Sequence, residues 1–135
     1  MRLLLDTHIF VWFALESRRL SAPAKAAITE PGNEIVVSTA TVWEISIKNA
    51  LGRLAFPLDK LDDLLARTGI EPLAVSVAHA VAAGGLPRHH ADPFDRMLIA
   101  QARLERLVLI TEDATLAHYD VAILGRTGTG GAVVT

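Results

Sequence analysis

Residues 3–6 read Leu-Leu-Leu-Asp, three apolar residues followed at once by an acid, and this stretch decides the fold. A short apolar run of this kind is typical of a buried strand in a parallel sheet. Similar runs occur at residues 35–37, 73–75, 107–110 and 121–124. Helical patterns lie between them, so the sequence predicts an α/β fold. We expect three layers, α/β/α, with a central parallel sheet of four to five strands.

The segments between the strands carry helix signals, namely polar cap residues, proline in a first turn and glycine at an end. Helices are expected over residues 8–15, from Ser21 through an Ala-rich segment, from Ser38 or Thr39 to Gly52, over 58–68, from Ser76 to Gly84, from Asp92 to Glu105, and as a short turn over 114–117.

The chain has 135 residues, 51% of them hydrophobic, which suits one packed domain. We expect that domain to span residues 1–124. Residues 125–135 contain four glycines and three threonines, so we expect a loosely packed tail. Cysteine is absent, which excludes disulfides and thiolate metal sites.

The remaining bulk properties concern location and partners. No apolar run approaches the ~20 residues of a membrane span, and the three leucines are too few for a signal peptide, so we expect a cytoplasmic protein with no membrane contact. The formal net charge is −2, which is unlike the basic surface of most nucleic-acid binders. Any basic footprint must be local, or supplied in part by metal ions.

Four acids are expected at one edge of the sheet. Asp6 ends the first strand, Glu44 lies early in the helix after the second, and Asp95 begins the helix before the fourth. Asp113 follows the fourth strand by two residues. The carboxyl ends of parallel strands meet at one edge, where ligands of such folds bind. Clustered carboxylates repel one another unless cations occupy the site, and hard oxygen ligands suit Mg²⁺ or Mn²⁺.

Each acid also has a structural explanation, although Asp6, at the end of an apolar strand, is the hardest to explain in that way. With Asp92 as helix cap, Asp95 falls at the third helical position, where an acid favours the helix dipole. Glu44 lies three residues after Thr41, a capping-box spacing, and Asp113 suits a cap for the short helix after it. These alternatives stay open for single residues. One shared cation site explains all four positions together.

The basic residues and histidines are less specific. Lys48 lies one helical turn beyond Glu44 and suits an ion pair with it. Arg53, Arg88 and Arg96 flank the expected site, with phosphate contact and plain solvation equally open for each. His89 and His90 suit either metal ligation or a solvated loop, and the loop is favoured.

The acids lie in segments that resemble the motifs of PIN domains. These segments are Leu3-Leu4-Leu5-Asp6-Thr7-His8, residues 38–45 (Ser-Thr-Ala-Thr-Val-Trp-Glu-Ile), residues 92–102 beginning Asp-Pro-Phe-Asp-Arg, and Leu109-Ile110-Thr111-Glu112-Asp113. They occur in the family's order over residues 3–113, and the compact length resembles the VapC-type toxins of type II toxin–antitoxin modules.

The resemblance implies an endoribonuclease that depends on Mg²⁺ or Mn²⁺, forms a homodimer and is inhibited by a cognate antitoxin. It implies catalytic roles for Asp6, Glu44, Asp95 and Asp113, with Asp6, Asp95 and Asp113 as metal ligands. Supporting roles fall to Thr7, Thr111 and Asp92. RNA contacts are expected among Lys48, Arg53, Arg88 and Arg96.

Two other functions stay open on the sequence. A phosphohydrolase with an aspartyl nucleophile typically has a second acid two residues after the first, where this chain has His8. A non-catalytic, receiver-like interaction domain would have an aspartate after the third strand, where this chain has Ser76. Both departures favour the metal-dependent ribonuclease.

Overall fold

The computed structural model describes residues 1–88, 91–124 and the backbone of 132–134. Its sheet has the strand order β3-β2-β1-β4-β5-β6. The strands are β1 (Arg2–Leu5), β2 (Glu34–Ser38), β3 (Glu71–Leu73), β4 (Val108–Ile110), β5 (Ala122–Leu124) and β6 (Ala132–Val134). The first five run parallel, and β6 pairs antiparallel with β5. The expected central parallel sheet is confirmed.

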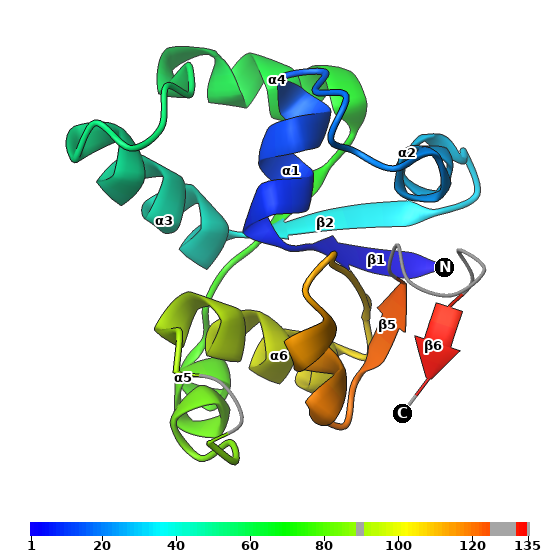
Figure 1. The fold of residues 1–135 in the computed structure, drawn as a ribbon, viewed down its shortest axis with the longest axis vertical. Helices are drawn as coiled ribbons and strands as arrows, with labels where there is room; N and C mark the ends of the chain where they lie inside the picture. Colours follow the sequence, from blue (N-terminus) through cyan, green and yellow to red (C-terminus); the bar gives the residue numbers. More distant parts are fainter. Residues whose placement is uncertain (89–90, 125–131, 135) are drawn as a thin grey trace.

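Helices cover both faces of the sheet, which gives the expected three layers (Figure 1). They are α1 (Thr7–Ala14), α2 (Ala22–Thr29), α3 (Thr39–Ala50), α4 (Leu61–Thr68), α5 (Val77–Gly84) and α6 (Pro93–Glu105), with 3₁₀ turns η1 (Leu58–Lys60) and η2 (Ala114–His118). In Figure 1, α1, α2 and α4 lie above the sheet, and α5 and α6 lie below it. Within the described residues, no helix is long and apolar enough to cross a membrane.

The alternation of side chains along β1 divides the core into two halves. Leu3 and Leu5 are buried with residues of α1, α2 and β2, whereas Leu4 is buried with residues of α6, β4 and β5. The strand is therefore apolar on both faces, which is why its sequence shows no alternation with polar residues. A strand covered on both faces at the centre of the sheet holds the residue after it, Asp6, in a fixed position.

The order of the strands reverses beside β1. The chain passes from β1 outward to β2 and β3, and then returns to the other side of β1 to form β4. In open α/β sheets, ligands bind outside the carboxyl ends of the strands at such a reversal. A ligand-binding site is therefore expected at the carboxyl ends of β1 and β4.

The third strand begins two residues earlier in the structure than the sequence indicated. The sequence indicated residues 73–75, whereas β3 is Glu71–Leu73 and includes Pro72 opposite Val37. Proline is tolerated because β3 lies at the edge of the sheet, where its missing N–H removes no bond to a further strand. The chain has already left the sheet at Val75, whose N–H donates to Thr39 Oγ1 at 3.3 Å.

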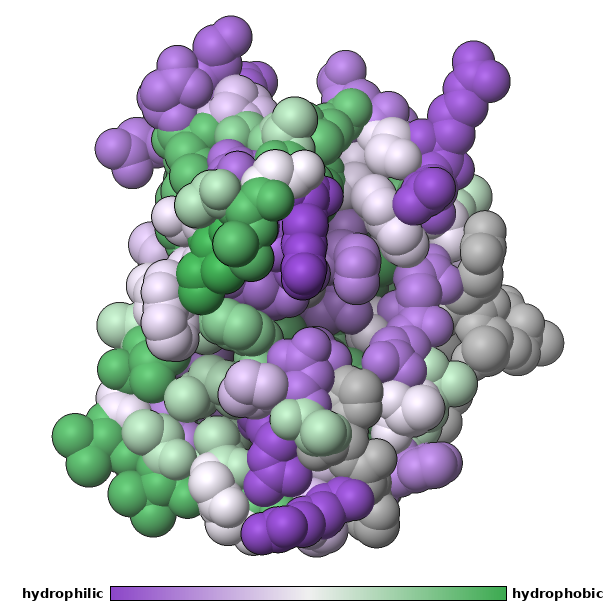
Figure 2. All heavy atoms as spheres, turned by 60° about the vertical axis from the view of Figure 1, so that its left-hand side comes forward, coloured by the Kyte–Doolittle hydropathy of each residue, from purple (hydrophilic) through white to green (hydrophobic). Residues whose placement is uncertain are grey.

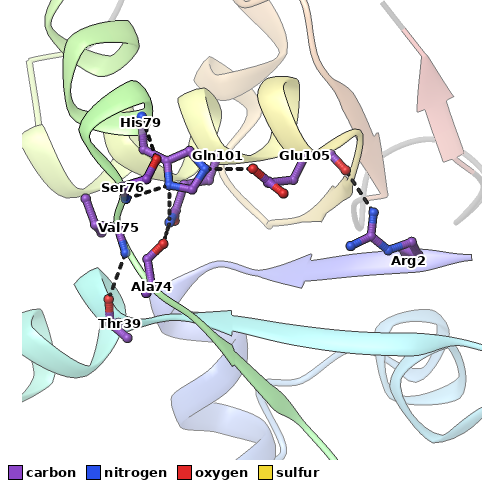
Figure 3. Close-up of polar contacts among 8 residues, drawn as sticks. All are labelled: Arg2, Thr39, Ala74, Val75, Ser76, His79, Gln101 and Glu105. Carbon is purple, nitrogen blue, oxygen red and sulfur yellow. Dashed lines mark hydrogen bonds and ion pairs between the residues drawn. The ribbon is translucent and has the colours of Figure 1, made fainter.

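Helix α5 is held against α6 by buried polar side chains (Figure 3). His79 Nδ1 accepts from the Ser76 N–H at 3.0 Å, within a capping box, and lies 3.3 Å from Gln101 Nε2. His79 Nε2 lies 2.9 Å from Glu105 Oε2. Since Nδ1 accepts, the imidazole carries its proton on Nε2 and donates it to the glutamate.

The predicted tail falls largely outside the described residues, which omit 125–131 and 135. The backbone of Ala132–Val134 forms the antiparallel strand β6, an element that the sequence analysis did not anticipate. The loose packing expected of residues 125–135, and their separation from a domain over 1–124, stay predictions.

Candidate active site

Asp6 is buried at the junction of β1 and α1, with 5% of its surface exposed. Its backbone N–H donates to the Ile110 carbonyl at 3.0 Å, which extends the pairing of β1 with β4 by one residue. Its Oδ1 accepts from the Ile9 N–H at 2.9 Å, so Asp6 is the N-cap of α1. Its Oδ2 accepts a hydrogen bond from the Thr111 hydroxyl. Both carboxylate oxygens are thus fixed by neighbouring elements.

The surroundings of Asp6 disfavour a negative charge. Burial raises the pKa of Asp6 from 3.8 to about 6. Hydrogen bonds from Thr111 and Ile9, and the proximity of His8, lower this pKa, while the negative charge of Asp95 raises it. The side chain of Asp95 is therefore close enough for its charge to act on Asp6. A positive charge between these two acids would favour the ionised form of both.

Asp95 owes its position to the start of α6. Asp92 caps this helix, because its Oδ1 accepts from the N–H groups of Phe94 at 2.8 Å and Asp95 at 3.3 Å. Pro93 occupies the first helical position and Asp95 the third, as the sequence indicated. The cap and the charge interaction with Asp6 coexist, so the structural explanation of this segment does not replace the functional one.

Asp113 is joined to Asp6 through Thr111. The Thr111 hydroxyl accepts from the Asp113 N–H at 3.0 Å and donates to Asp6. Asp113 also caps η2, since its Oδ1 accepts from the N–H of Thr115 at 2.9 Å and from its hydroxyl at 2.7 Å. One buried threonine therefore ties the acid after β1 to the segment that carries the acid after β4.

Glu44 forms a second, adjacent cluster. The Thr7 hydroxyl donates to Glu44 Oε1 at 2.6 Å, and Lys48 Nζ lies 2.8 Å from Glu44 Oε2. The side chain of Glu44 is 8% exposed and that of Lys48 is 34% exposed. Because Thr7 follows Asp6 directly, the two clusters touch through consecutive residues of one chain segment.

Thr41 belongs to this cluster and was missed as a site residue. It is buried, and its Oγ1 lies 3.3 Å from that of Thr7. The spacing of three residues between Thr41 and Glu44, which places both on one face of a helix, was the available signal. The same spacing also suits a capping box, but the N-cap of α3 is Ser38.

The donor set of the site consists of carboxylate and hydroxyl oxygens, which suit a hard divalent cation. The negative charge of Asp95 raises the pKa of Asp6, and hydrogen bonds through Thr111 link Asp6 to the backbone of Asp113. Among the described residues, no three acidic or histidine side chains are close enough to hold a metal ion between them. Glu44 uses its two oxygens for Thr7 and Lys48, so it lies beside the other acids and not among them.

The basic residues lie at different depths around this edge. Arg96 Nη2 donates to the carbonyls of Ala83 at 3.0 Å and Leu86 at 2.8 Å, which secures the chain after α5. Arg88 is exposed and lines a cavity of about 350 Å³ together with Arg96. Arg53 is exposed beyond the far end of α3, about 18 Å along that helix from the sheet edge. His89 and His90 lie outside the described residues.

Figure 2 turns toward the reader the side at which the strands end and α3 begins. This face is hollowed near its middle. Hydrophilic residues lie in and around the hollow, and hydrophobic residues lie beside it. The edge of the sheet that carries the acids is thus an open, partly polar surface.

Known proteins are similar to this chain in sequence and in fold. Residues 3–122 match the family model of the PIN domain. The ribonuclease VapC22 of Mycobacterium tuberculosis is 30% identical over 122 residues, which cover 86% of this chain and 90% of the relative.

Solved structures share the fold at lower identity. A chain from the crystal structure of VapBC2 from Rickettsia felis, bound to a promoter DNA fragment, has a TM-score of 0.67 at 17% identity and covers 93% of this chain and 98% of its own. A chain from a toxin–antitoxin complex of Klebsiella pneumoniae has a TM-score of 0.57 at 24% identity, with coverages of 82% and 85%.

The family match spans the four acids and the threonines that connect them, from Asp6 to Asp113. The relative from Mycobacterium tuberculosis covers nearly all of the same length. On this evidence, the chain belongs to the PIN-domain family.

Proposed function

We propose that this protein is a metal-dependent endoribonuclease and the toxin of a toxin–antitoxin module. The observation that carries the proposal is the buried Asp6, which lies at the reversal of strand order beside β4 and within the field of Asp95. The similarity to the ribonuclease VapC22 of Mycobacterium tuberculosis supports RNA as the substrate. The fold shared with chains of toxin–antitoxin complexes supports a cognate antitoxin as partner.

In this proposal a divalent cation, for which Mg²⁺ or Mn²⁺ is the chemical match, would draw together the side chains of Asp6, Asp95 and Asp113, which in the described residues do not yet form a group close enough to hold a metal ion. Such a cation supplies an activated water and offsets charge on the scissile phosphate. Thr111 orients Asp6 through its hydroxyl, and Thr7 orients Glu44. Asp92 fixes the start of the helix that carries Asp95.

Glu44 lies beside the three proposed metal ligands. Its Oε1 is held by Thr7 and its Oε2 by Lys48, so the carboxylate is fixed in position next to the acids. From there its carboxylate would accept a hydrogen bond from the attacking water and so position that water. Lys48 pairs with Glu44 and adds positive charge near the substrate phosphates.

The proposed RNA contacts are Lys48, Arg53 and Arg88. Arg96 is left out, because its guanidinium donates to backbone carbonyls of the segment after α5. A homodimer belongs to the same proposal. So does action in the cytoplasm, since a toxin of this kind meets RNA and antitoxin there.

The deciding experiment incubates the purified chain with mixed cellular RNA and Mg²⁺ or Mn²⁺, with and without EDTA. Cleavage that EDTA abolishes supports the proposal. Asp6→Asn retains a capping side chain, so it should stay folded and lose activity by at least about 100-fold. Asp62→Asn, a change of an exposed acid on α4, is the matched control and should retain activity.

Other results would select other functions. Full cleavage of RNA by the Asp6→Asn variant contradicts the assigned site. Hydrolysis of a small phosphate ester without RNA cleavage selects a phosphohydrolase. Neither activity, at any metal concentration, favours an interaction domain that does not catalyse a reaction.

A further inference from the structure

Arg96 fastens the end of α5 to the start of α6. Its Nη2 donates to the carbonyls of Ala83 at 3.0 Å and Leu86 at 2.8 Å, and its Nη1 donates to that of Pro87 at 3.0 Å. The last carbonyls of a helix have no partner within that helix, and a guanidinium with several donors is suited to bind them. The end of α5 is thus held by the helix that carries Asp95.

The other end of α5 is held to α6 as well. His79, early in α5, contacts Glu105 at the end of α6 and Gln101 one turn before it (Figure 3). The start of α5 therefore lies beside the end of α6, and the end of α5 lies beside the start of α6. A helical hairpin joined at both ends leaves the first turn of α6 little freedom to shift against the segment after α5.

The Pro87 carbonyl, which belongs to that segment, has a second donor. The Tyr119 hydroxyl donates to it at 3.0 Å from a side chain that is 2% exposed. A carbonyl oxygen has two lone pairs, so it accepts from Arg96 and Tyr119 together. Tyr119 directly follows η2, whose N-cap is Asp113. One backbone oxygen therefore joins the hairpin that carries Asp95 to the turn that carries Asp113.

The side chains of Asp95 and Arg96 serve two different contacts. The residues are consecutive, and consecutive side chains of a helix point in directions about 100° apart. Arg96 reaches the carbonyls after α5, whereas the charge of Asp95 acts on Asp6. Any shift of the start of α6 against Pro87 therefore displaces Asp95 from the other acids.

We propose that Arg96 and Tyr119 are positioning residues, which share the Pro87 carbonyl and thereby set the separation of Asp95 and Asp113. The inference rests on the proposed metal-dependent function. To hold a cation the acids must approach one another, since no three acidic or histidine side chains of the described part of the chain are close enough. Segments that are already tied together have less freedom to lose in that step, so the link favours metal binding.

Tyr119→Phe removes the hydroxyl and keeps the ring in the core. Binding of Mn²⁺ to the full-length chain without RNA, measured by calorimetry, should weaken by about tenfold, the lower end of the usual cost of losing a group that orients a metal ligand. Ile28→Val is the matched control, because it removes one carbon from the core beside the first residues of β1 and β2, at the opposite edge of the sheet. It should leave the Kd for Mn²⁺ unchanged.

Arg96→Lys tests the other donor without changing the net charge. A single ammonium cannot replace the planar fork that binds these carbonyls, so this variant should also weaken Mn²⁺ binding. The double variant with Tyr119→Phe should weaken binding by less than the product of the two single effects, because both act on one carbonyl. An effect equal to that product would overturn the shared role of Pro87.

Cleavage assays distinguish positioning from a purely structural role. Tyr119→Phe should lower kcat at limiting Mn²⁺ with an unchanged KM for RNA, and excess Mn²⁺ should restore kcat. A purely structural role predicts a lower Tm of the metal-free protein with the Kd for Mn²⁺ of the unsubstituted chain. That result would overturn the inference.

Asp6→Asn separates this inference from the function on which it rests. If Asp6→Asn abolishes Mn²⁺ binding and Tyr119→Phe weakens it, the positioning role is supported. If Asp6→Asn abolishes binding and Tyr119→Phe leaves it unchanged, the positioning role alone is overturned. If Asp6→Asn binds Mn²⁺ as tightly as the unsubstituted chain, the proposed metal site is wrong and this inference fails with it.

Discussion

Thr111 donates a hydrogen bond to Asp6 although 105 residues separate them. The contact exists because β1 and β4 are neighbours in the sheet, paired from Leu3 opposite Val108 to Leu5 opposite Ile110. Each residue follows its own strand directly, so the two side chains meet at the edge where the strand order reverses. The same hydroxyl accepts from the N–H of Asp113. Thr111 is thus the connection between two of the proposed metal ligands.

Replacing Thr111 by valine should lower metal-dependent cleavage by about 10- to 100-fold, the usual cost of losing a group that orients a metal ligand. Valine has nearly the same shape as threonine but leaves Asp6 Oδ2 and the Asp113 N–H without the hydroxyl. Thr111→Ser keeps the hydroxyl and should recover most of the rate. Equal activity of the valine and serine variants would show that this hydrogen bond does not matter for catalysis.

The stability of the metal-free protein should depend on pH through Asp6. Burial raises the pKa of Asp6 to about 6, so the folded state favours the protonated carboxyl. Its contribution is fully present below pH 3.8 and is lost as the pH rises through 6. The shift of about 2 units corresponds to about 3 kcal/mol.

Asp6→Asn removes this titration, because an amide is neutral at every pH. In EDTA, its advantage in unfolding free energy over the unsubstituted protein should grow by about 2 kcal/mol between pH 4 and pH 7. Urea denaturation at both pH values measures the difference. A constant difference between the two proteins would show that Asp6 ionises normally in the fold.

Divalent cations should reverse the order of stability at neutral pH. A cation that binds only the folded state stabilises it by about 2.7 kcal/mol at 100 times its Kd, which corresponds to a Tm increase of about 10 °C for a domain of this size. The Tm of the unsubstituted protein should therefore rise when Mg²⁺ or Mn²⁺ is titrated. The Tm of Asp6→Asn should hardly move, and an equal rise in both would place the cation elsewhere.

The ion pair of Lys48 with Glu44 should matter far more than a similar pair at the surface. Lys48→Met leaves the buried Glu44 without its cation, and we expect a loss of about 1–3 kcal/mol in unfolding free energy together with reduced cleavage. Arg67→Met breaks the exposed pair with Asp63, which has the same helical spacing, and should change the Tm little. Equal effects of the two substitutions would contradict a special role for Lys48.

Much of the fold follows from local rules that a single sequence displays. The leucines of β1 indicated a strand buried on both faces, and Ser38, Ser76 and Asp92 indicated helix starts that the structure confirms. The positions of Asp6 and Asp95 at one edge followed from the direction of parallel strands. Those features depend on residues close together in the chain, or on a topology with few alternatives.

Features that depend on unrelated parts of the chain were not predictable in this way. The third strand was expected at residues 73–75, and the place of Pro72 inside β3 depends on the position of that strand at the sheet edge. For Arg96, phosphate contact and plain solvation were equally open on the sequence, whereas its bonds to the carbonyls after α5 depend on how α5 packs on α6. The contact of Trp43 with Phe94 joins two helices whose packing no local pattern reveals.

The neighbouring positions of β1 and β4 have a consequence for how the protein is made. A ribosome synthesises β1 first, but the strand that completes the site emerges more than a hundred residues later. Until then, the newly made chain has Asp6 without Thr111 or Asp113. The proposed metal ligands of the growing polypeptide therefore cannot come together until the segment after β4 has left the ribosome.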